Sequence, residues 1–149
     1  MGLFDGVFKT ANQMTDGSLS AAEAFAAVCL VAIAADGYLS EQEGRNMTVM
    51  LSRMQLFRTY SNDVLHRTFD KLLAMLKRQG PGPLVNLAKA SLPQNLRETA
   101  FAMATDLILS DGAVTEQEQA FLDDLHHILE ISGDTALKIV QVMTIKNRG

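Results

Sequence analysis

The sequence has no tryptophan and little cysteine, proline or tyrosine: one Cys, three Pro and two Tyr among 149 residues. The single cysteine, Cys29, excludes an internal disulfide and a metal site built from thiolates alone, and it fits a reducing cytoplasm. Hydrophobic residues make up 48% of the chain and charged residues 20%, a balance that excludes the usual composition of a disordered protein. The length predicts a single domain.

Long hydrophobic runs are also missing. The longest one, residues 24–35 (AFAAVCLVAIAA), has 12 residues, whereas a membrane-spanning helix needs about 20, so this run predicts a buried helix. The N-terminal residues MGLFDGVFKT have no basic region ahead of a long apolar core, so we expect no secretory signal. No nucleophile elbow, phosphate-binding loop, H-E-x-x-H or dinucleotide fingerprint occurs, and we therefore expect no enzymatic activity.

Charge is distributed unevenly along the chain. Residues 45–97 carry nine Lys or Arg against two acids, a local balance of +7, whereas residues 98–134 carry nine acids and no Lys or Arg, a balance of −9. The acidic segment argues against nucleic acid as the main ligand and permits cations. Opposite charge on different segments would also suit protein partners or self-association into a homo-oligomer.

Helix-capping signals predict an all-α, single-domain bundle of about seven helices. Ser20, Ser40 and Thr115 are each followed three residues later by Glu, which is the capping-box pattern. Asp-Gly pairs at 36–37 and 111–112 end two helices, and the Gly80–Pro83 break ends another. No stretch alternates apolar and polar residues in the manner of a strand. The expected helices span about 20–35, 40–54, 61–79, 84–90, 93–110, 115–131 and 134–146.

The chain also contains an internal repeat. Asp36 and Gly37 align with Asp111 and Gly112, 75 residues later, and Glu-Gln-Glu at 41–43 aligns with the same triplet at 116–118. Two helical hairpins would then share one joint, D-G-x-φ-[ST]-E-Q-E, where φ is aliphatic. This divides the chain into an amphipathic leader (1–19) and a helical domain (20–149), with repeat one at about 20–55, basic linker helices at 56–92, repeat two at 93–131 and a C-terminal helix at 134–146.

The two joints allow two interpretations. In the first, each residue has a structural role, because Asp-Gly ends one helix and Ser or Thr with Glu caps the next. In the second, the joint matches the later half of an EF-hand loop, in which Asp, Ser or Thr, and Glu supply oxygen ligands. Alanine and leucine occupy the first and third ligand positions, which argues against a free-standing EF-hand. Two half-sites sharing an ion, or each completed by water, stay open.

Three further features have less specific patterns. Asp106 lies in an otherwise apolar helix, and a hydrogen-bonded helix-face carboxylate is favoured over an additional metal ligand. Asp123 with His127, and His126 with Glu130, are pairs at one-turn spacing, for which a solvated helix face is favoured over a zinc site. The leader has one apolar stripe, and docking on the bundle or on a partner is favoured over a membrane surface.

The segment AAVCLVAIAADGYLSEQE and its echo AFAMATDLILSDGAVTEQE resemble the duplicated core of the tellurite-resistance TerB family, to which the N-terminal domain of DjlA co-chaperones is related. The short leader GLFDGVFK is also similar to the start of TerB proteins. The resemblance implies an all-helical domain, metal binding by acidic joint residues and association with other tellurite-resistance or stress-response proteins. Carried over residue by residue, it implicates as metal ligands Asp36, Glu43, Asp111 and Glu118. Weaker candidates are Ser40 and Thr115, from the EF-hand comparison, and Asp106.

The sequence therefore predicts a cytoplasmic, non-enzymatic TerB-like module in which these carboxylates bind a hard divalent cation. Ca²⁺, Mg²⁺ and Mn²⁺ are expected ahead of Zn²⁺, because the ligands are oxygen atoms. The alternative is a scaffold that binds protein partners through its oppositely charged segments, with the joints acting only as helix caps.

Overall fold

The computed structural model describes residues 18–35, 40–110 and 112–148, and within these ranges the chain is helical with no strand, which confirms the all-α prediction. The helices are α2 (Ala21–Ile33), α3 (Glu41–Ser52), α4 (Asn62–Gln79), α5 (Pro81–Ala90), α6 (Gln94–Leu109), α7 (Glu116–Ile128) and α8 (Gly133–Lys146), with one 3₁₀ turn at Gln55–Phe57. None of these helices is long and apolar enough to cross a membrane. The leader predicted at 1–19 falls almost wholly outside the described residues.

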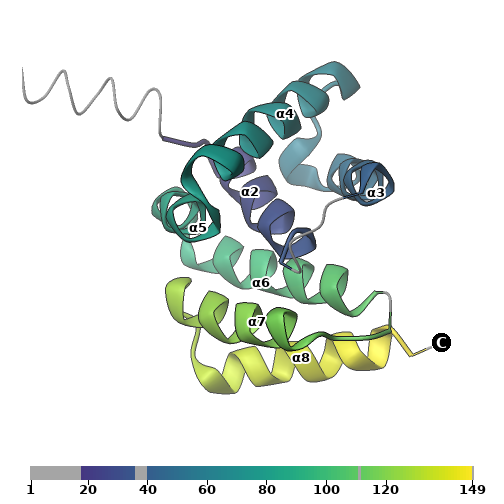
Figure 1. The fold of residues 1–149 in the computed structure, drawn as a ribbon, viewed down its shortest axis with the longest axis vertical. Coiled ribbons are helices and arrows are strands. Elements are labelled where there is room, and N and C mark those ends of the chain that lie inside the picture. The colour runs from purple at the N-terminus through teal and green to yellow at the C-terminus, as the bar shows by residue number, and fades with distance from the viewer. Residues whose placement is uncertain (1–17, 36–39, 111, 149) are drawn as a thin grey trace, which may run out of the picture.

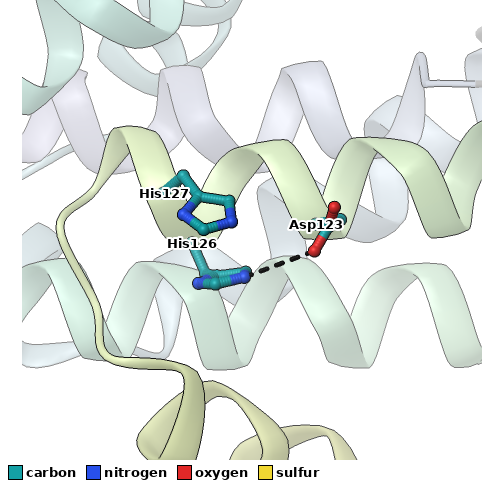
Figure 2. Close-up of side chains that lie close together, drawn as sticks. All are labelled: Asp123, His126 and His127. Atoms are coloured by element: carbon teal, nitrogen blue, oxygen red, sulfur yellow. Dashed lines mark ion pairs between the residues drawn. The ribbon is translucent and has the colours of Figure 1, made fainter.

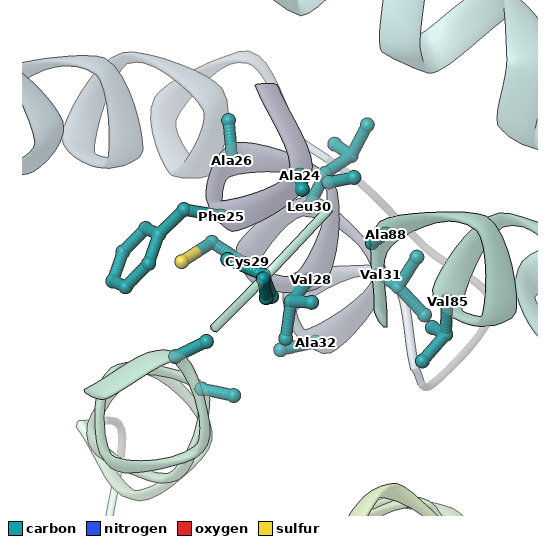
Figure 3. Close-up of a cluster of buried hydrophobic side chains, with 14 of the residues drawn as sticks. Ala24, Phe25, Ala26, Val28, Cys29, Leu30, Val31, Ala32, Val85 and Ala88 are labelled. Atoms are coloured by element: carbon teal, nitrogen blue, oxygen red, sulfur yellow. The ribbon is translucent and has the colours of Figure 1, made fainter. Parts of the chain in front are cut away.

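Helix α2 is the centre of the bundle, and its burial confirms the prediction from its uninterrupted apolar sequence. It packs against α3, α4, α5 and α6, and every residue from Ala24 to Ile33 is buried. Figure 3 shows its side chains pointing outward in several directions, with Phe25 and Cys29 on one side and Val31 facing Val85 of α5. A helix that is apolar on all sides is stable in water only when neighbours surround it. Cys29 is fully buried, so its thiol lies in the core.

The remaining helices form two groups around α2. In Figure 1, α3, α4 and α5 lie in the upper part of the molecule, and α6, α7 and α8 are stacked in the lower part. Helix α6 connects the two groups, because it packs against α2 on one side and against α7 and α8 on the other. The basic segment 45–97 therefore lies mostly in the upper group, and the acidic segment 98–134 mostly in the lower group.

Two helix starts differ from the prediction, both because of local backbone chemistry. Helix α5 begins at Pro81 and not at residue 84, since proline has the backbone angle of a helix and lacks only an N–H that the first turn leaves unpaired anyway. Gly80 makes the bend between α4 and α5 with a φ of 87°, a left-handed value that glycine adopts without steric cost. Helix α8 begins at Gly133, because the side chain of Ser132 caps it by accepting the N–H of Thr135.

The starts of α3 and α7 are 75 residues apart, which is the spacing of the predicted repeat. Helix α3 begins at Glu41 and follows α2, and helix α7 begins at Glu116 and follows α6. Helices α2 and α6 pack directly against each other. That the two hairpins are a duplication stays a prediction.

Candidate functional site

The first joint ends in a complete capping box at the start of α3. The hydroxyl oxygen of Ser40 accepts the backbone N–H of Glu43 at 3.0 Å, and Oε1 of Glu43 accepts the backbone N–H of Ser40 at 3.2 Å. The Ser40 hydroxyl also donates to the same Oε1 at 3.0 Å. These bonds satisfy two backbone donors that the helix start would otherwise leave unpaired.

The second joint repeats this arrangement at the start of α7. Oγ1 of Thr115 accepts the backbone N–H of Glu118 at 3.1 Å, and Oε1 of Glu118 accepts the backbone N–H of Thr115 at 2.9 Å. Glu118 is buried, with only 8% of its surface exposed. Within this joint, Gly112 follows α6 with a φ of 83°, a left-handed value that glycine adopts without steric cost.

In the described part of the chain, no basic side chain balances the charge of the two capping glutamates. Among the residues that the structure describes, neither Glu43 nor Glu118 forms an ion pair with Lys or Arg. Backbone N–H groups and the positive end of each helix stabilise the carboxylates in part. The capping box uses Oε1 of each residue, so each carboxylate has a second oxygen that the cap does not require.

The other two principal predicted ligands, Asp36 and Asp111, lie outside the described residues. Within the described ranges, Glu43 and Glu118 belong to no group of three potential ligand side chains. The capping role is therefore visible in the hydrogen bonds, whereas the metal-binding role of the four carboxylates stays a prediction. What the fold contributes is that α2 and α6, which lead into the two joints, are packed neighbours (Figure 1).

Asp106 lies on α6 and connects this helix to the end of α8. Its Oδ1 accepts hydrogen bonds from Nζ of Lys146 at 3.0 Å and from Nδ2 of Asn147 at 2.8 Å. The Asp106 side chain is only 20% exposed, and Lys146 supplies a counter-charge. This arrangement is that of the hydrogen-bonded helix-face carboxylate that the sequence favours.

A groove beside the first joint had no functional interpretation from the sequence. It has a volume of about 450 Å³, lies between α3 and α4, and is lined by Ser40, Gly44, Thr48 and His66 among others. Gly44 keeps the two helices close, because a Cβ atom there would lie 3.1 Å from Cζ of Phe69. The small residues at 40, 44 and 48, one helical turn apart, are the sequence signal that could have predicted this groove.

One comparison with known proteins identifies the family. The family model described as "Tellurite resistance protein TerB" matches residues 22–140, from the start of α2 into α8 and across both joints. No curated protein and no solved structure gives a significant match to the chain. The match covers most of the sequence and agrees with the all-helical architecture, so this chain belongs to the TerB family of tellurite-resistance proteins.

Proposed function

We propose that this chain is a non-enzymatic module of a tellurite-resistance or stress-response system, and that its two acidic joints bind a hard divalent cation. One observation carries the proposal: Glu118 is a buried carboxylate whose hydrogen-bond donors are neutral and which has no Lys or Arg partner among the described residues. Buried charges in proteins are usually paired or coordinate a metal ion. A cation at the joint would supply the missing opposite charge.

The donor set determines which ion fits. The carboxylates of Asp36, Glu43, Asp111 and Glu118 offer only oxygen, the ligand that Ca²⁺, Mg²⁺ and Mn²⁺ prefer. Thiolate coordination is not available, because burial raises the pKa of the Cys29 thiol and holds the sulfur inside the core. When bound, the ion would offset repulsion within each joint and stabilise the native arrangement of the helices around it.

The family and this chemistry support a proposed biological role. The module would act by binding other tellurite-resistance or stress-response proteins, or a second copy of itself, in a manner that depends on the bound ion. The reducing cytoplasm is the setting that fits a chain with one buried thiol. If the joints bind no ion, the oppositely charged segments would make the chain a protein scaffold, which is the alternative that the experiment separates.

The test is thermal unfolding of chelator-treated, full-length protein with Ca²⁺, Mg²⁺ or Mn²⁺ added separately. An ion present at 100 times its dissociation constant stabilises the native state by about 2.7 kcal/mol. For a domain of this length that is a rise in melting temperature of roughly 5–11 °C. The double variant Asp36→Asn/Asp111→Asn should lose the rise.

The variant Asp124→Asn/Asp134→Asn is the matched control, because it removes two exposed carboxylates, one on α7 and one on α8, away from both joints. It should keep the full response to the ion. A response of the wild type to none of the three ions, or an equal response of the joint variant, would refute ion binding at the joints.

A further inference from the structure

A second group of potential ligands lies on α7, apart from its capping box. Within the described part of the chain, Asp123, His126 and His127 each offer one ligand atom, and these three atoms lie within 4.8 Å of one another. Figure 2 shows the two imidazole rings side by side on the helix, with the Asp123 carboxylate beside them. Glu130, the other acid at helical spacing from His126, pairs with Lys89 of α5 instead, and this contact lowers the pKa of Glu130.

The turn after α7 fixes the orientation of His126. Glu130 adopts a left-handed backbone with a φ of 57°, and the N–H of Ile131 donates to the carbonyl of His126 at 2.9 Å. This turn is a Schellman motif, and it brings the carbonyl oxygen of Ile131 to 3.1 Å from Nδ1 of His126. The ring also packs edge-on against Phe101, with the ring centroids 6.3 Å apart, and the side chain is only 14% exposed.

The carbonyl contact determines which nitrogen of His126 is available. A carbonyl oxygen only accepts hydrogen bonds, so Nδ1 must carry a proton, and in the neutral ring the lone pair is therefore on Nε2. Metal-binding histidines in proteins are commonly oriented in this way, with the second ring nitrogen donating to a backbone carbonyl or a carboxylate. Nε2 of His126 points towards Asp123, as the dashed line in Figure 2 marks.

The distance between these two groups fits a shared ion. Nε2 of His126 and Oδ1 of Asp123 are 3.4 Å apart, which is longer than the 2.7–2.9 Å of a strong charge-assisted hydrogen bond. With a neutral ring, both atoms are acceptors, so a cation between them would be attracted by both. Two ligand atoms bound at about 2.0–2.2 Å to a tetrahedral zinc ion lie about 3.4 Å apart.

We propose that Asp123, His126 and His127 form a binding site for Zn²⁺ or a similar imidazole-preferring transition-metal ion. His127 is exposed and its ring centroid lies 4.0 Å from that of His126, so a side-chain rotation would bring its free nitrogen to the same ion. The fourth position faces solvent, because a groove of about 310 Å³ between α7 and α8 adjoins Asp123 and His126. This position can hold water or a ligand atom from a partner protein.

The site differs in chemistry and place from the joints. It has two nitrogen ligands and one oxygen, which favour Zn²⁺ over Ca²⁺ or Mg²⁺, and it lies near the C-terminal end of α7 rather than at its start. The inference does not rest on ion binding by the joints, and the two proposals fail independently. The joint variant Asp36→Asn/Asp111→Asn should keep Zn²⁺ binding, and substitutions at the histidines should keep any response to Ca²⁺, Mg²⁺ or Mn²⁺.

The test is isothermal titration of untagged, chelator-treated, full-length protein with Zn²⁺, together with the visible absorption of bound Co²⁺ as a report on coordination. The wild type should bind one ion per chain. Removing even an outer partner of a metal site typically costs 10–100-fold in affinity. His127→Ala and His126→Ala should therefore each weaken binding by more than about tenfold.

His66→Ala is the matched control, because it removes the only other histidine, which lies on α4. This variant should bind Zn²⁺ as the wild type does. His127 is exposed, so loss of binding in His127→Ala cannot be attributed to lost packing, and circular dichroism should give the same helix content. Absence of saturable binding in the wild type, or wild-type affinity in His127→Ala, would overturn the proposal.

Discussion

The capping glutamates allow the structural and metal-binding roles of the joints to be separated by one pair of substitutions. Glutamine at positions 43 and 118 keeps a side-chain oxygen that accepts the N–H of Ser40 or Thr115, and it removes the negative charge. Alanine removes both the hydrogen bond and the charge. We therefore compare Glu43→Gln/Glu118→Gln with Glu43→Ala/Glu118→Ala, with and without added ion.

Without ion, the two double variants should differ in stability. Each capping hydrogen bond contributes about 0.5–1.5 kcal/mol, so the alanine variant should lose about 1–3 kcal/mol. For a domain of this length this corresponds to a fall in melting temperature of roughly 2–12 °C. The glutamine variant loses only the interaction of each charge with its helix start, about 0.3–1 kcal/mol per site, and regains part of it because Glu118 no longer buries a charge.

With ion, the glutamine variant should behave differently from the wild type. The wild type should gain about 2.7 kcal/mol at an ion concentration 100 times the dissociation constant, and the glutamine variant should gain nothing because its amides are much weaker ligands. Differential scanning calorimetry at fixed pH, in chelator and then in excess ion, measures both effects. An equal gain in both proteins would refute a ligand role for Glu43 and Glu118. An equal loss for glutamine and alanine without ion would refute the hydrogen-bond account of the caps.

Three further predictions concern the fold. Partial burial of Glu23 raises its pKa, but hydrogen bonds from Lys71 and Ser20 outweigh this and hold the pKa below its usual value. The pair therefore stabilises the fold above the unfolded pKa of about 4.3, and this stability is lost as the pH falls through the folded pKa. Lys71→Met should flatten the acid side of the profile of melting temperature against pH. The effect should be under about 1 kcal/mol, because solvent screens this pair. Cys29 should resist alkylation until global unfolding, with labelling that follows the denaturant transition, since its side chain is fully buried. Asp106→Ala should speed amide hydrogen exchange around Asn147 at the end of α8 and lower the free energy of unfolding by at most about 1 kcal/mol. Unchanged exchange there would contradict a role of Asp106 in holding the end of α8 against α6.

The sequence by itself determined where α2, α3 and α7 begin and that the apolar run at 24–35 is buried. The capping boxes at Ser20, Ser40 and Thr115 all form as predicted, because their hydrogen bonds join residues only three apart and need no tertiary partner. The apolar run at 24–35 could become stable only by burial, and it forms the centre of the bundle. The family was also recognisable from the two joint sequences.

The local sequence did not predict the backbone conformation at two chain bends, the turn after α7 and the start of α5. The αL residue after α7 is Glu130, not glycine, so no residue type marked the Schellman motif that ends that helix. The start of α5 at Pro81 could not be predicted, because the adjacent Gly and Pro residues are typical of loops as well as of helix starts. In each case the local residue types were compatible with more than one backbone conformation.

Only the tertiary structure decided which side chains meet. Glu23 pairs with Lys71, 48 residues away, and Asp106 with Lys146, 40 residues away, at positions that no local pattern connects. The burial of Glu118 and the contact of His126 with Phe101 likewise depend on how α7 packs against the rest of the bundle. Helix starts are governed by hydrogen bonds within one turn, and the residues of one turn are close together in the sequence. The neighbours of a side chain depend on how the helices cross, and that is decided by the packing of the whole core.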